Sequence, residues 1–154
     1  MRVAGQVRVK VPREEAFKIL TNPDALSRCT PGLEAMEIVE PGRRFRGAGV
    51  VGVGAVRIHF TTEIEWLDLS PPRGARMRMV CRARRRTIDI GSHFELTDGR
   101  DGWTDMTWSA DIELHGPLAG LAAPFLRPAA LKIAGEFLEC IRKRIEGAAA
   151  TGGS

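Results

Sequence analysis

The chain of 154 residues has no tyrosine, only three histidines and three cysteines, and no long apolar run. Because no window of about 18 consecutive apolar residues occurs, we expect no transmembrane helix. The segment Met1–Gln6 enters directly into an alternating pattern and carries no apolar core of a signal peptide. We therefore expect one domain that works in the cytoplasm.

The cysteines Cys29, Cys81 and Cys140 are far apart and odd in number. None of them forms the Cys-x-x-Cys spacing of many zinc sites, and the spacing does not indicate a disulfide framework. We expect all three to be reduced and mostly buried. A reactive thiol at Cys29, beside the turn at Pro31 and Gly32, is the alternative.

A catalytic site needs convergent titratable groups, and the sequence indicates no such set. The strand patterns place His59 and His93 on the outward side, and His115 lies at a strand end. Ser92 and Thr62 are predicted to point inward, but neither has a base beside it. No pair of possible metal ligands recurs four residues apart with a third partner. We expect no catalytic residues, no metal and no cofactor.

The net charge of +4 comes mostly from arginine, and the excess is concentrated in one region. Its members are Arg73, Arg76, Arg78, Arg82, Arg84, Arg85 and Arg86. Such a cluster is typical of a solvated strand face and turn, and it also suits an anionic partner. No nucleic-acid motif accompanies it, so we expect no nucleic-acid binding.

Alternation of apolar and polar residues predicts seven strands. They are 2–11, 34–40, 44–54, 55–69, 75–83, 88–96 and 103–115. Two short helices follow the first strand, one opened by Pro12 and one running from Pro23 to Arg28. Hairpin-length turns join the later strands, so they should form an antiparallel meander. Glycines 47, 49, 52 and 54 suit a bent strand or a close approach of another group.

The segment from Gly116 to Glu146 is the one long stretch with helical periodicity. Its apolar stripe is Leu118, Leu121, Ala122, Phe125, Ala129, Ile133, Phe137, Ile141 and Ile145. Pro124 and Pro128 favour a long helix that starts near Pro124, with 117–123 as a separate short element. One kinked helix from Pro117 is the alternative. We expect residues 147–154 to form a disordered tail after a single domain of residues 1–146.

Large and adaptable apolar residues face inward on the predicted strands. They are Phe60, Ile64, Trp66, Met77, Met79, Cys81, Ile90, Phe94, Met106 and Trp108. Such side chains can fill a core or line a cavity between sheet and helix, and periodicity does not choose between the two.

Several exact residues resemble the CoxG family, accessory proteins of carbon monoxide dehydrogenase that belong to the START-like (SRPBCC, Bet v 1-like) helix-grip superfamily. Asn22-Pro23, Leu26, Cys29, Pro31 and Gly32 resemble the family motif D-P-x-x-L-x-x-C-x-P-G. Further matches are Val11-Pro12 with Glu15 and Phe17, Pro71-Pro72-Arg73, Thr104, Met106, Trp108, Ala110, Asp111, Gly116–Ala119, and Phe137-Leu138 with Cys140. The motifs around Cys29 and Gly116 are the more specific ones.

The resemblance implies an α+β helix-grip fold. A curved seven-stranded antiparallel sheet would carry two short helices after strand 1 and a long C-terminal helix across its concave face. It also implies a hydrophobic ligand, lipid or quinone-like, in a cavity between them. The ligand-binding residues would be Phe60, Trp66, Met77, Met79, Phe94, Trp108, Leu121, Phe125, Ile133 and Phe137.

The expected partners are that small molecule, a molybdenum hydroxylase-type dehydrogenase complex and a peripheral contact with the inner face of the membrane. Two other functions stay open. One is a cyclase- or hydrolase-type enzyme of the same superfamily, which would use Ser92, Thr62 or, after a one-residue slip in register, Asp111. The other is a protein-interaction module without ligand, with the arginine-rich strand as its docking face.

Overall fold

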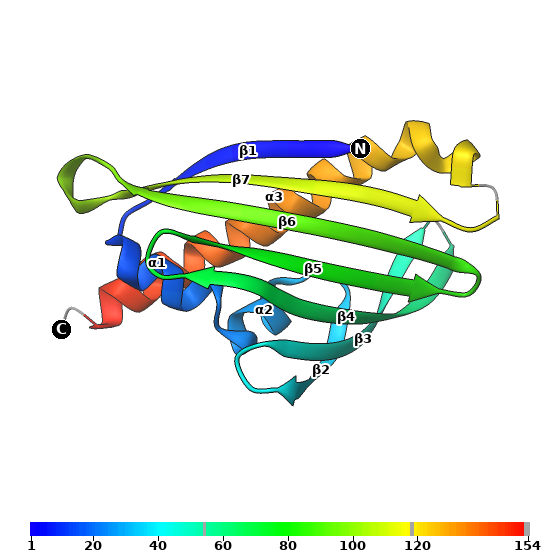
Figure 1. Cartoon of the computed structure of the whole chain (residues 1–154), viewed down its shortest axis with the longest axis horizontal. Coiled ribbons are helices and arrows are strands. Elements are labelled where there is room, and N and C mark those ends of the chain that lie inside the picture. Colours follow the sequence, from blue (N-terminus) through cyan, green and yellow to red (C-terminus); the bar gives the residue numbers. More distant parts are fainter. Residues whose placement is uncertain (54, 118, 153–154) are drawn as a thin grey trace.

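The computed structural model describes residues 1–53, 55–117 and 119–152 and shows a sheet with helices packed on one face (Figure 1). The elements in chain order are β1 Arg2–Val9, α1 Arg13–Leu20, α2 Pro23–Cys29, β2 Leu33–Glu40, β3 Arg44–Val53, β4 Val56–Ser70, β5 Gly74–Ala83, β6 Arg86–Asp98, the 3-10 helix η1 Arg100–Gly102, β7 Thr104–His115 and α3 Ala119–Gly152. The predicted element order is confirmed, with strand ends shifted by one or two residues.

The seven strands form one antiparallel sheet in the order β1-β7-β6-β5-β4-β3-β2. Strands β2 to β7 form the predicted meander, because each pairs with its neighbour in sequence. Strand β1 pairs instead with the last strand, with Val3 opposite Ala110. We call the face covered by α1, α2 and α3 the inner face and the opposite one the outer face.

The arginines of the outer face mostly pair with acidic residues on neighbouring strands. Arg78 contacts Asp89 at 2.8 Å, and Arg82 contacts Glu63 at 3.5 Å. Arg2 donates to Asp111 at 2.9 Å, so Asp111 faces outward as the alternation predicts. Cross-strand pairs of opposite charge stabilise a solvated sheet face modestly. This part of the arginine cluster therefore belongs to a self-neutralised surface.

The two short helices begin and end where their sequences predict. Asn22 caps α2, since its side-chain oxygen accepts hydrogen bonds from the backbone N–H groups of Asp24 and Ala25 at 2.8 and 3.2 Å. The apolar sides of both helices, including Phe17 and Leu26, are buried against the sheet. They close one end of the inner face.

Helix α3 is one helix from Ala119 to Gly152, and both Pro124 and Pro128 lie inside it. The expectation of a start near Pro124 was therefore wrong, and the single-helix alternative holds. Each proline removes one backbone donor, and Figure 1 shows the first turns bending away from the line of the rest. The helix also continues beyond Gly147, where we expected a disordered tail. None of the described helices is both long and apolar enough to cross a membrane.

A disulfide joins Cys29, at the end of α2, to Cys140 in α3. Our expectation that all three cysteines are reduced was wrong. The packing of α2 against α3 brings the two Cα atoms to 5.4 Å, within the range that a disulfide requires. Cys81 remains a free thiol.

Candidate functional site

The inner face has a packed part close to α1 and the C-terminal half of α3. Leu96 and Met106 from the sheet and Ile141 and Ile145 from α3 are all buried there. The Phe94 ring lies edge-on to Trp66, with ring centroids 6.4 Å apart. Since tight packing leaves no room for another molecule, this part is hydrophobic core.

Further along the same strands, the inner face is only partly covered. Cys81, Ile88 and Leu114 face inward in one row across β5, β6 and β7, and each is half-buried. The next row contains Met79 and Ile90, which are also half-buried. Apolar side chains that keep solvent contact on a face under a helix are the surface that a hydrophobic ligand would cover.

Trp108 lies over the backbone of β1, at the border between the packed and open parts. A Cβ atom on Gly5 would lie 2.8 Å from the Trp108 indole nitrogen, so the ring occupies the space of the missing side chain. Gly5 is directly opposite Trp108 in the β1–β7 register. The glycine therefore fixes where the indole lies.

Phe60 lies near the other edge of the sheet. A Cβ atom on Gly49 would come within 2.8 Å of the Phe60 ring and would collide with the Gly32 carbonyl. The carbonyl of Gly32 accepts a hydrogen bond from the Val50 backbone N–H at 3.0 Å. Of the four strand glycines, Gly49 and Gly47 thus permit close approach. Gly52 has nothing near it, and Gly54 lies outside the described residues.

The polar groups of the inner face are few and uncharged. The Cys81 thiol donates to Thr62 Oγ1 at 3.4 Å, and Thr62 is buried. Burial raises the pKa of the Cys81 thiol, although the contact with Thr62 opposes this shift. Ser92 lies opposite Met77 and is half-buried. Among the described residues, no three His, Cys, Asp or Glu side chains form a metal-binding group.

The structure brings six of the ten predicted ligand residues to the core or its border. These are Trp66, Met77, Met79, Phe94, Trp108 and Phe137. Phe60 lies apart from them, over Gly49. On α3, Leu121 and Phe125 have exposed fractions of 70% and 74%, and that of Ile133 is 49%. These three residues do not join the six. Leu118, predicted to belong to the same stripe, lies outside the described residues.

The prediction missed two features that border this area. One is the side of α3 that covers the sheet, which includes Leu126, Ala130 and Ala134 rather than Leu121 and Phe125. The correct phase of the helix would have indicated it. The other is the disulfide at Cys140, for which the sequence contains no signal of pairing.

Comparison with known families identifies the group to which this arrangement belongs. The family model for CoxG, described as a component of carbon monoxide dehydrogenase, matches residues 5–146. The chain belongs to the CoxG family. No curated protein sequence matches the chain.

Solved structures confirm the helix-grip fold of this CoxG-family chain. A conserved protein from Geobacillus kaustophilus is 22% identical with a TM-score of 0.87, over 96% of this chain and 97% of that one. The Zhui aromatase/cyclase from Streptomyces sp. R1128 is 17% identical with a TM-score of 0.72, over 96% and 94%. A START superfamily protein from Mycobacterium smegmatis is 18% identical with a TM-score of 0.61, over 97% of each chain.

Proposed function

We propose that this CoxG-family protein binds an uncharged hydrophobic small molecule, lipid or quinone-like, on the open part of the inner face beneath α3. The observation that supports the proposal is the row of half-buried apolar residues at Cys81, Ile88 and Leu114. Covering this surface would remove apolar area from water, which stabilises a complex. A carboxylate or phosphate ligand would find no cation there among the described inner-face residues, and burying its charge would be unfavourable.

We propose a carrier or accessory role rather than catalysis, in connection with a molybdenum hydroxylase-type dehydrogenase such as carbon monoxide dehydrogenase. The family supports the accessory role. The likeness to an aromatase/cyclase keeps an enzyme as the second candidate. An acid or base directed at the ligand would favour the enzyme, but the described inner-face polar groups are Thr62, Ser92 and the Cys81 thiol.

A peripheral contact with the inner face of the cytoplasmic membrane is part of the proposal. Leu121 and Phe125 are the most exposed large apolar residues described in the chain. The turn of Arg84, Arg85 and Arg86 lies beside the start of α3, since a Cβ atom on Gly116 would meet the Arg85 carbonyl oxygen. Exposed apolar side chains beside arginines suit an anionic lipid surface.

The ligand can be tested with Nile red, a neutral dye, and with decylubiquinone as its competitor. Ser92→Phe adds a ring to the inner face, and His93→Phe adds the same ring to the next, outward position. Overpacking costs on the order of 1–3 kcal/mol, so we expect Ser92→Phe to weaken dye binding about tenfold. His93→Phe should bind the dye as the wild type does. Equal binding by both variants, or no displacement by decylubiquinone, would contradict the proposal.

A further inference from the structure

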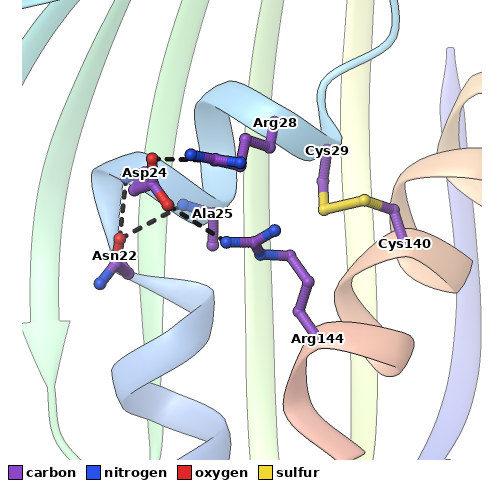
Figure 2. A network of polar contacts seen from close by, with 7 residues as sticks. All are labelled: Asn22, Asp24, Ala25, Arg28, Cys29, Cys140 and Arg144. Carbon is purple, nitrogen blue, oxygen red and sulfur yellow. Dashed lines mark hydrogen bonds and ion pairs between the residues drawn. A yellow bond between two sulfur atoms is a disulfide. The ribbon is translucent and has the colours of Figure 1, made fainter. Parts of the chain in front are cut away.

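The Cys29–Cys140 disulfide lies within a small network that ties α2 to α3 (Figure 2). One turn after Cys140, Arg144 donates to Asp24 in α2 at 3.1 Å. Asp24 also accepts a hydrogen bond from Arg28 at 3.1 Å. The ion pairs are exposed to solvent, so they hold the helices weakly. The disulfide is therefore the strong connection on this flank.

The same flank of α3 continues toward the open part of the inner face. Residues three or four apart lie on one side of a helix, so Arg144, Cys140, Phe137 and Ile133 form one row. Phe137 is half-buried and Ile133 is exposed. The row thus passes from the tie with α2 to apolar side chains that a ligand beneath α3 would contact. The disulfide marks the inner end of this row.

The preceding part of α3 is held by little else. Among its described residues before Phe137, the one long-range hydrogen bond runs from Arg127 to the Arg2 carbonyl at 3.0 Å. This bond attaches α3 to the edge strand β1, on the flank away from α2. The position of α3 over the open inner face therefore depends on an edge contact on one side and on the disulfide on the other.

The disulfide can be reached from one side only. Cys29 is buried, whereas Cys140 is half-buried and borders a shallow surface depression lined by Glu136, Glu139 and Lys143. A thiolate from outside would therefore attack the Cys140 sulfur. In the cytoplasm that we propose, disulfides are mostly transient or redox-sensing, so a reversible pair fits that location.

We propose that Cys29–Cys140 is a reversible thiol–disulfide site, reduced by a dithiol protein or small dithiol, and that its state sets how tightly α3 retains the ligand. The second half of this inference rests on the proposed function. One thiolate of the dithiol bonds to the Cys140 sulfur, and Cys29 leaves as a thiolate and takes a proton. The second thiolate then closes the dithiol into a disulfide and releases Cys140, which is protonated in turn.

Reduction should loosen α3 without unfolding the domain. Ile141 and Ile145 are buried in the core in both redox states, because they pack against the sheet independently of the sulfur bridge. The part of the helix before Phe137 lacks such anchors. We therefore expect the effect of reduction in residues 119–137 and in the open strands below them.

The test compares oxidised wild type, wild type reduced with dithiothreitol, and the double variant Cys29→Ser/Cys140→Ser. Hydrogen exchange should accelerate in residues 119–137 on reduction. Nile red should dissociate about threefold faster or more, because a less ordered helix holds the dye less firmly. The matched control is Cys81→Ser, whose exchange and dye release should keep the full response to reduction.

The outcomes separate this inference from the proposed function. If no dye binds in either redox state, the ligand proposal fails, while faster exchange on reduction still supports the thiol–disulfide site. Equal exchange and equal dye release in both states would overturn the inference and leave ligand binding intact. It would also be overturned by a disulfide that dithiothreitol cannot reduce in the folded protein, or by global unfolding on reduction.

Discussion

Loss of the disulfide should lower the free energy of unfolding by a large and calculable amount. Cys29 and Cys140 are 111 residues apart. For a closed loop of that length, the chain-entropy relation gives a stabilisation of about 4.8 kcal/mol at 25 °C. Since domains are stable by about 5–15 kcal/mol, the reduced protein should be much less stable yet still folded.

The corresponding change in melting temperature follows from the length of the chain. At about 2.1 cal/mol/K per residue, 154 residues give an unfolding entropy of about 0.32 kcal/mol/K. Dividing the free energy by this entropy predicts a decrease of about 15 °C. The assay is thermal unfolding followed by far-ultraviolet circular dichroism, with and without a reductant, together with urea unfolding at room temperature.

Cys81→Ser leaves the bridge intact and should show the same decrease on reduction as the wild type, so it serves as the control here too. The variant Cys29→Ser/Cys140→Ser should melt near the reduced wild type and should not respond to the reductant. A difference below about 1 kcal/mol between oxidised and reduced protein would refute the reasoning, because the loop would then be constrained in the unfolded chain without the bridge.

Three further perturbations test the inner and outer faces. Gly5→Ala places a methyl group where the Trp108 indole lies, 2.8 Å from its nitrogen, so we expect a shifted tryptophan emission maximum and a lower melting temperature. The raised pKa of the Cys81 thiol predicts that iodoacetamide reacts more slowly than with an unfolded control at mildly alkaline pH, and that the difference narrows as pH rises through the folded pKa. Arg78 lowers the pKa of Asp89, so Asp89→Asn should slightly reduce the melting temperature at neutral pH. That effect should disappear as pH falls through the lowered pKa, below 3.8, and a constant difference across pH would contradict it.

The strands could be predicted closely because each shows one alternating face. Along β7, Met106 and Trp108 alternate with Asp105 and Thr107, and the structure places the two sets on opposite faces as expected. A period of two residues fixes the face without reference to the rest of the protein. The same local signal made the antiparallel meander predictable from its short turns.

The helix α3 shows why periodicity alone misplaced part of the candidate site. The apolar stripe advances mostly in steps of four residues, and each such step turns the side chain by about 40° at 3.6 residues per turn. From Leu121 to Ile145 the stripe therefore winds about 240° around the helix. Ile141 and Ile145 are buried, but Leu121 and Phe125 point to solvent. Only the position of the sheet decides which part of the stripe is covered.

The disulfide could not be predicted for a different reason. Neither the spacing between Cys29 and Cys140 nor their neighbours in sequence carries information about pairing. Their proximity depends on the angle at which α3 crosses the sheet and meets α2, which is a property of the assembled fold. Long-range contacts of this kind require the tertiary structure.

The pairing of β1 with β7 also affects how the chain is made. Arg2 and its partner Asp111 are 109 residues apart. At synthesis rates of about 5–20 residues per second, β1 leaves the ribosome roughly 5–20 seconds before β7 can bind it. During that interval Val3 and Val9, which are buried in the finished sheet, have no native partner strand. The first strand to be synthesised is thus among the last to be paired, and it is the segment most in need of protection from aggregation at the ribosome.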